Sequence, residues 1–114
     1  MTDNSELPLE VDVQTVAKMQ QSEDSFVLLD VREQQEFDTA RIGGSRLIPM
    51  SELRERVQEL EDCRDQRIVV HCHHGMRSLQ VTQAMRQAGF SKTQSMAGGI
   101  DQWSTEIDDA VPRY

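Results

Sequence analysis

Short apolar runs alternate with amphipathic stretches along most of this chain. Two runs, Phe26–Val31 and Arg67–His71, have the length and apolar character of buried strands. Three shorter strands are predicted at 7–11, where Pro8 is tolerated at a sheet edge, at 47–48 and at 93–96. Stretches with helical spacing separate these runs, so the pattern predicts strand–helix units.

The helical stretches carry recognisable start signals and buried faces. Asp12 is a suitable N-cap for the first helix, and Ser51 for a helix in the middle of the chain. A short polar helix over 32–40 has Phe37 as its main buried residue. A longer helix is predicted from Ser78 to residue 88. The helical spacing places these residues on buried faces: Val13, Val16, Ala17 and Gln20; Leu53, Val57 and Leu60; Val81, Ala84, Met85 and Ala88; Ile100, Trp103 and Ile107.

This alternation predicts an α/β fold with a mostly parallel central sheet and helices on both faces. Residues 1–6 are predicted to form a flexible polar leader, and residues 7–114 a single domain. Ligands of such sheets bind beyond the carboxyl ends of the strands, and the segment after His71 lies at one of these ends.

The charge balance narrows the classes of partner. The chain has 114 residues with 20 acidic and 12 basic side chains, a net charge of −8. This balance argues against nucleic-acid binding and against docking on anionic membranes. The sequence shows no secretory signal and no apolar run of membrane-spanning length. Cys63 and Cys72 do not make a disulfide framework, and Cys63 is expected at the surface, so we expect a cytoplasmic protein.

Cys72 is the main candidate for chemistry. It follows a buried strand and precedes a helix, with Gly75 between them for a tight turn. Free backbone N–H groups and the positive end of the helix dipole then surround one sulfur, which favours its reactive thiolate form. A buried and inert cysteine is the alternative interpretation.

The neighbours of Cys72 allow two interpretations each. His73 and His74 are either loop side chains that point to water or part of a metal site. Adjacent ligands on one tight turn diverge, so we expect no metal and no cofactor. Arg77 either binds an anionic substrate or forms a structural ion pair. Asp30 and Arg32 are expected to be structural and to tie adjacent loops together.

Four segments of the chain form a recognisable set. They are Leu29-Asp30-Val31-Arg32-Glu33 with Glu36-Phe37, the segment Ala40–Pro49, the loop Cys72-His73-His74-Gly75-Met76-Arg77-Ser78, and Gly98-Gly99-Ile100 with Trp103. In this order, the set resembles the signature segments of the rhodanese family. The third resembles the family's Cys-x-x-Gly-x-Arg-Ser active-site loop. The second departs from the family pattern, with Ala40-Arg41 in place of Gly-His, Gly43 in place of Pro and Ser45 in place of Ala.

The resemblance implies a single-domain sulfurtransferase. Cys72 would take a sulfane sulfur from a donor such as thiosulfate or a persulfide, and would pass it to a thiophilic acceptor. The N–H groups of residues 73 to 77 would cradle the anion, so that His73, His74, Gly75, Met76 and Arg77 form the substrate-binding set. The resemblance implies a small molecule or a protein as donor and acceptor, and leaves the choice and the oligomeric state open.

Two other functions compete with sulfur transfer. Phosphatases and arsenate reductases of related fold also use a cysteine–arginine loop, but phosphatase loops have five residues between the two. Here four residues, 73–76, separate Cys72 from Arg77, which favours a sulfur-sized group over a tetrahedral phosphate. A non-enzymatic rhodanese-like binding module is the third possibility; such modules usually lack the cysteine.

Overall fold

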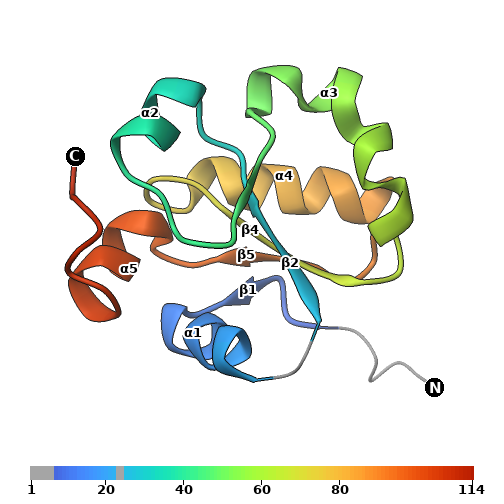
Figure 1. Cartoon of the computed structure of the whole chain (residues 1–114). Helices are drawn as coiled ribbons and strands as arrows, with labels where there is room; N and C mark the ends of the chain where they lie inside the picture. Colours follow the sequence, from blue (N-terminus) through green and yellow to red (C-terminus); the bar gives the residue numbers. More distant parts are fainter. Residues whose placement is uncertain (1–6, 23–24) are drawn as a thin grey trace.

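A computed structural model describes residues 7–22 and 25–114. The predicted leader, residues 1–6, lies outside the described residues. Within them the centre of the molecule is a five-stranded sheet in the order β1-β5-β4-β2-β3 (Figure 1). Every neighbouring pair in this sheet is parallel, which confirms the predicted fold class. The strands are β1 (Glu10–Val11), β2 (Phe26–Asp30), β3 (Arg46–Leu47), β4 (Arg67–His71) and β5 (Thr93–Met96).

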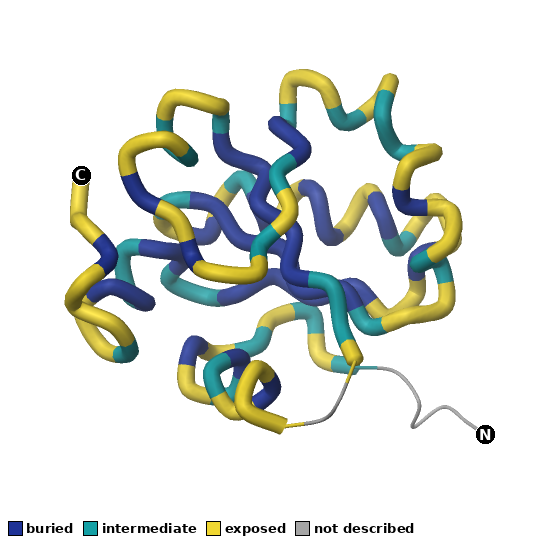
Figure 2. The backbone as a smooth tube through the Cα atoms, viewed as in Figure 1, coloured by how far each residue is buried: buried dark blue, intermediate teal, exposed yellow. Residues whose placement is uncertain are grey.

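Helices cover both faces of the sheet. In Figure 1, α1 lies below it, α3 and α4 lie above it, and α5 lies at its left end. The buried residues of α1 and α5 belong to one cluster. The α-helices are α1 (Val13–Gln21), α2 (Gln34–Thr39), α3 (Leu53–Arg56), α4 (Met76–Gln87) and α5 (Gly99–Glu106). Two 3₁₀ helices, η2 (Met50–Glu52) and η3 (Val57–Cys63), flank α3. The central strands β2, β4 and β5 are therefore largely buried between two layers, as their dark colour in Figure 2 shows, while the edge strands β1 and β3 are more exposed.

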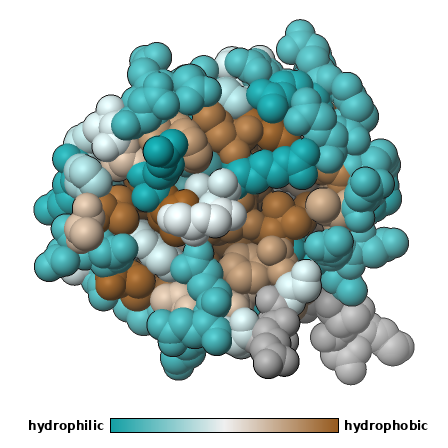
Figure 3. Space-filling model, viewed as in Figure 1, coloured by the Kyte–Doolittle hydropathy of each residue, from teal (hydrophilic) through white to brown (hydrophobic). Residues whose placement is uncertain are grey.

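The two faces of the sheet bury separate hydrophobic clusters. Side chains alternate along each strand. Leu28 and Val69 therefore join the cluster under α1 and α5, while Leu29 and Val70 join the cluster under α3 and α4. Cys72 follows β4 and belongs to the second cluster, so the candidate nucleophile is buried among hydrophobic side chains. On the face seen in Figure 3, hydrophobic residues gather toward the centre and hydrophilic residues surround them.

The first helix begins where the sequence predicts. The Thr15 backbone N–H donates to Asp12 Oδ1 at 2.8 Å, which confirms Asp12 as the N-cap. Val13 and Val16 are buried as expected, but Met19 is the third buried residue and Gln20 is exposed. The apolar side chain of Met19, on the same face of the helix, is buried in place of the polar side chain of Gln20.

The second and third helices differ from the prediction. Ser51 does not cap a helix; it lies within η2, and its Oγ donates to Glu33 Oε1 at 3.0 Å. Phe37 is only half-buried, and the Arg41 guanidinium lies over its ring, 4.9 Å from the centroid. No residue of α2 is fully buried, so polar contacts rather than hydrophobic packing hold this helix in place.

The buried face of α4 is rotated from the predicted one. Val81 and Met85 are buried as expected, but Ala84 and Ala88 are exposed along an apolar groove between α4 and α3. The remaining buried residues of α4 are Ser78 and Thr82. This rotation turns the Ser78 hydroxyl toward the sheet, at the end of the molecule that holds Cys72.

A fully buried ion pair lies at the carboxyl end of β2. Arg32 Nη2 lies 2.6 Å from Asp30 Oδ2, and both side chains are completely buried. The same guanidinium donates to the Ala40 carbonyl at 2.6 Å. The pair therefore ties the strand end to the segment after α2, as the sequence predicts for Asp30 and Arg32, and its loss would leave an unpaired buried charge.

His71 is buried next to this pair. It pairs with Asp30 in the register of β4 and β2, and its Nε2 lies 3.8 Å from Asp30 Oδ2. Burial lowers the pKa of His71 to about 4, against the opposing effect of Asp30. The ring is therefore neutral in the folded protein at neutral pH.

We predict that acid destabilises the protein through His71 well before the carboxylates titrate. An unfolded histidine binds a proton below about pH 6.5, whereas the buried one resists protonation until about pH 4. The free energy of unfolding should therefore fall by about 2 kcal/mol between pH 7 and pH 5. Urea unfolding at both pH values measures this, and His71→Leu should remove most of the difference. An equal pH dependence in the His71→Leu protein would contradict the prediction.

Candidate active site

The Cys72 sulfur lies at the base of the loop between β4 and α4. Two backbone N–H groups donate to its Sγ, from Gly75 at 3.1 Å and from Ser78 at 3.3 Å. Cys72 is only 1% exposed. Two converging N–H donors stabilise a negative charge on sulfur. Gly75 belongs to the predicted cradle of residues 73 to 77, whereas Ser78 lies one residue beyond it.

The turn at Gly75 makes this geometry possible. Gly75 has φ +110°, a left-handed conformation that residues with a Cβ rarely adopt, and it serves as the N-cap of α4. A Cβ there would also lie 3.3 Å from the Gly98 nitrogen. Because the chain turns sharply at Gly75, α4 begins at Met76, two residues earlier than predicted from the sequence.

A pair of buried serines lies beside the sulfur. Ser78 Oγ is 3.5 Å from Cys72 Sγ and 2.7 Å from Ser95 Oγ. Ser95 comes from the neighbouring strand β5, and both serines are fully buried. The hydroxyl pair places a polar group next to the sulfur inside a hydrophobic layer. Ser78 is part of the loop motif in the sequence, but no sequence signal marks Ser95.

The first turn of α5 binds the backbone of the loop. The Ile100 N–H donates to the Cys72 carbonyl at 2.9 Å, and the Asp101 N–H donates to the His73 carbonyl at 3.1 Å. Gly99 allows this approach, since a Cβ there would lie 2.4 Å from the His73 oxygen and 2.6 Å from the Cys72 oxygen. Gly99, the first residue of α5, thus lets the helix bind the backbone of the loop.

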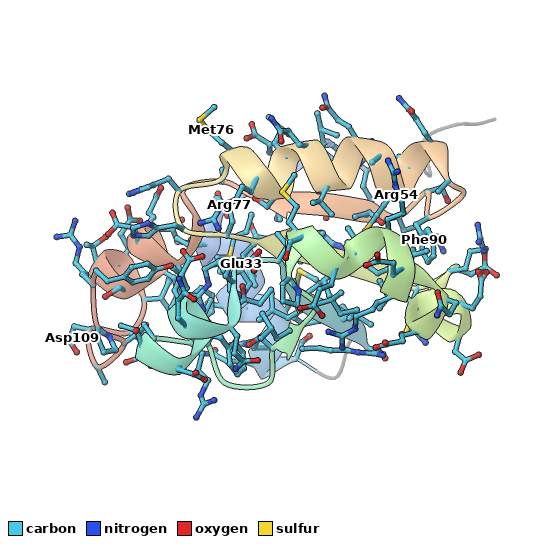
Figure 4. The ribbon with its side chains drawn as sticks, turned by 90° about the horizontal axis from the view of Figure 1, so that it is seen from above. Glu33, Arg54, Met76, Arg77, Phe90 and Asp109 are labelled. Atoms are coloured by element: carbon cyan, nitrogen blue, oxygen red, sulfur yellow. The ribbon has the colours of Figure 1, made fainter. Side chains whose placement is uncertain are left out.

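Arg77 forms an ion pair with a residue of α2. Its Nη1 and Nη2 donate to Glu36 Oε1 at 2.8 Å and Oε2 at 3.0 Å. Figure 4 shows Arg77 turned toward α2 and its first residues, near Glu33. The hydrogen bond from Arg77 is the main cause that lowers the pKa of Glu36 to about 2. The structure therefore shows the ion pair that the sequence left as one of two roles for Arg77.

The two loop histidines lie in different surroundings. His74 is exposed, with Nδ1 4.0 Å from Asp101 Oδ2. His73 is partly buried between the His74 ring and the Tyr114 ring, each with its centroid 4.0 Å away. Burial, followed by the neighbouring His74, lowers the pKa of His73, so it is neutral at neutral pH. The sequence gives no signal for Tyr114 at this site.

Met76 and Cys63 have different surroundings. Met76 is 77% exposed and projects outward from the start of α4 (Figure 4). Cys63, expected at the surface, is half-buried against the cluster under α3 and α4, because η3 turns it inward. Within residues 7–22 and 25–114, no three His, Cys, Asp or Glu side chains group closely enough to hold a metal ion.

Comparisons with known proteins identify the family. A family model described as "Rhodanese-like domain" matches residues 12–106. The chain is 34% identical over 80 residues to the uncharacterized protein YqhL of Bacillus subtilis, covering 70% of this chain and 62% of that protein. It is 29% identical over 78 residues to the thiosulfate sulfurtransferase GlpE of Coxiella burnetii, covering 68% of this chain and 71% of that protein. It therefore belongs to the rhodanese-like domain family.

Solved structures agree with this assignment. The human single-domain sulfurtransferase TSTD1 superposes with a TM-score of 0.77 at 26% identity, covering 87% of this chain and 97% of that one. The chain spans only 52%, 62% and 22% of the length of the first three curated relatives it matches. In the part of the chain that is described, no helix is long and apolar enough to cross a membrane.

We predict that the contact at Gly99 shapes the loop. Gly99→Ala adds a Cβ that collides with the Cys72 and His73 carbonyls, at a residue with φ +61°. It should lower the free energy of unfolding by at least about 1–2 kcal/mol and slow the alkylation of Cys72. Gly43→Ala is the matched control, because nothing lies within 4 Å of its added Cβ. Equal effects of the two substitutions on stability and alkylation would show that the contact at Gly99 has no such role.

Proposed function

We propose that this protein is a sulfurtransferase that carries sulfane sulfur as a persulfide on Cys72. The observation that carries the proposal is the pair of N–H groups, from Gly75 and Ser78, that converge on the Cys72 sulfur. Hydrogen bonds from these N–H groups also stabilise the charge that returns to Sγ when an acceptor removes the outer sulfur of the persulfide. Relatives named as sulfurtransferases at about 30% identity support this activity.

The proposed reaction has two displacement steps. In the first, the Cys72 thiolate attacks the outer sulfur of the donor. With thiosulfate, a new S–S bond forms on Cys72 while the bond to the SO₃ group breaks, and sulfite leaves with the electron pair. In the second, an acceptor thiolate attacks the outer sulfur of the persulfide. The S–S bond on Cys72 breaks, and the Cys72 thiolate is regenerated without any net oxidation of the protein.

The depth of the sulfur suits this transfer. Cys72 is 1% exposed, so little of its Sγ faces solvent. A persulfide extends the reactive atom outward by about 2 Å, the length of an S–S bond. The intermediate is therefore held at its base by the loop, and its outer sulfur is presented nearer to the surface. The four residues His73, His74, Gly75 and Met76 separate Cys72 from Arg77, a spacing that suits a sulfur-sized group.

Arg77 is proposed to guide an anionic donor to the loop. The ion pair with Glu36 uses one N–H of each terminal nitrogen, and a guanidinium has five N–H donors. Its side chain is 35% exposed, so the remaining donors can reach a bound anion. Glu36 then positions the cation as well as partly neutralising it. His73 and His74 line the opposite part of the loop as further contacts for the donor or the acceptor.

We predict that Cys72 is the only thiol needed for turnover. Cys72→Ser should abolish transfer from thiosulfate to cyanide or a thiol, because a serine oxygen cannot form the persulfide. Cys63→Ser is the matched control and should keep most of the activity, since Cys63 lies in η3 among hydrophobic side chains. Sulfite release and product formation measure both. Loss of turnover in a folded Cys63→Ser protein would point to a relay between two thiols.

We predict that Arg77→Ala lowers kcat/KM for thiosulfate by about ten- to hundredfold, the usual cost of a lost charged hydrogen bond. Thermal stability should change little, since a partly exposed ion pair contributes about 1 kcal/mol or less. Arg77→Lys should recover part of the rate, because it keeps the charge without the planar fork. Unchanged turnover of Arg77→Ala, or an unfolded protein, would make Arg77 a structural residue.

A further inference from the structure

The segment that follows α5 returns to the Cys72 loop. Val111 is buried in the cluster under α1 and α5, and its carbonyl accepts a hydrogen bond from Ser104 Oγ. Arg113 then pairs with Asp101, with Nε 2.9 Å from Oδ1. These two anchors bring Tyr114 to the carboxyl end of the sheet, beside α2 (Figure 1).

The Tyr114 hydroxyl joins two ion pairs. It accepts a hydrogen bond from Arg32 Nη1 at 2.9 Å and donates one to Glu36 Oε2 at 2.8 Å. Arg32 belongs to the fully buried pair with Asp30, while Glu36 holds Arg77. Burial raises the pKa of Tyr114 to about 12, so the hydroxyl keeps its proton at neutral pH. One hydroxyl thereby connects the fully buried Arg32–Asp30 pair to the partly exposed Arg77–Glu36 pair, and Arg77 stands at the end of the Cys72 loop, which we call its mouth.

The Tyr114 ring contacts the other side of the loop. It stacks on the His73 ring with a centroid separation of 4.0 Å and an interplanar angle of 7°. Tyr114 is nevertheless 41% exposed. A residue that only filled the core would be covered, so core packing does not account for Tyr114. Its contacts are instead with His73, Arg32 and Glu36. None of these contacts reaches the Cys72 sulfur, so the residue acts through its neighbours.

We propose that Tyr114 is a positioning residue that fixes the Arg77 guanidinium at the mouth of the Cys72 loop by holding Glu36 in place. The proposal rests on the role of Arg77 in the proposed function. Glu36 Oε1 is already fixed by the Glu33 N–H at 3.0 Å. Tyr114 fixes the second oxygen, and both oxygens of the carboxylate are then aligned with the guanidinium fork. Without the hydroxyl, Glu36 and Arg77 can swing together away from an approaching anion.

The test compares two alkylating reagents that differ in charge. Iodoacetate is an anion and iodoacetamide is neutral, and both react with the same sulfur, so the ratio of their rates reports the cation at the mouth. All proteins carry Cys63→Ser, so that only Cys72 reacts. Tyr114→Phe keeps the ring and removes both hydroxyl contacts. It should lower the iodoacetate-to-iodoacetamide ratio by roughly two- to tenfold, the effect of one lost hydrogen bond.

Two further variants give the limits of this experiment. Arg77→Ala should lower the ratio at least as far as Tyr114→Phe. Asp109→Ala, an exposed residue of the same segment at the outer edge of the molecule in Figure 4, should leave the ratio unchanged. The melting temperature of Tyr114→Phe should stay close to that of the parent protein. These results support the proposal, and they do not depend on whether the protein transfers sulfur.

Other outcomes overturn the proposal. A parental ratio in Tyr114→Phe, with a lowered ratio in Arg77→Ala, would show that Tyr114 does not position the cation. An equal loss of rate with both reagents, or a large fall in melting temperature, would make Tyr114 a purely structural residue. A parental ratio in Arg77→Ala would remove the role of Arg77 and this inference with it. Failure of the parent to transfer sulfur would instead refute the proposed function alone.

Discussion

The candidate site depends on one contact between two backbones. The start of α5 donates N–H groups to the carbonyls of Cys72 and His73, and it can come this close only because residue 99 is a glycine. This contact fixes the start of the loop at Cys72 and His73. At the other end, the left-handed conformation of Gly75 directs the chain into α4. The N–H groups of Gly75 and Ser78 then meet at the sulfur. The sheet order makes the contact possible, because β4 and β5 are neighbours and their carboxyl ends lie together.

Around this loop, three arginines each pair with a carboxylate, and the exposure of the arginine side chain increases from one pair to the next. Arg32 and Asp30 are fully buried, Arg77 and Glu36 are partly exposed, and Arg113 and Asp101 lie near the surface. A buried pair is a costly way to gain stability, but it gives a rigid reference point at the end of β2. The Tyr114 hydroxyl links the first pair to the second. The carboxylates hold each guanidinium in a defined position, although each pair is neutral overall.

Much of this arrangement could be predicted from the sequence, and the failures have physical causes. The strands Arg67–His71 and Thr93–Met96, the cap at Asp12 and the position of Cys72 depend on local patterns, and all were predicted correctly. The predictions that Ser51 caps a helix and that Phe37 is a buried residue were wrong. Ser51 instead contacts Glu33, and Phe37 contacts Arg41, and local sequence patterns do not reveal such tertiary contacts. Glu36 and Tyr114 were missed as site residues because their partners are 41 and 78 positions distant. No spacing rule connects residues so far apart, and only the fold brings them together.

The most direct test of sulfur transfer is the mass of the protein after incubation with thiosulfate and removal of the excess donor. The proposed mechanism predicts that the intact protein gains one sulfur atom, that the gain is found on the peptide containing Cys72, and that cyanide or a thiol removes it. No gain on Cys72, with thiosulfate and with a persulfide donor alike, would contradict the proposed function. A gain confined to Cys63 would contradict the assignment of the nucleophile.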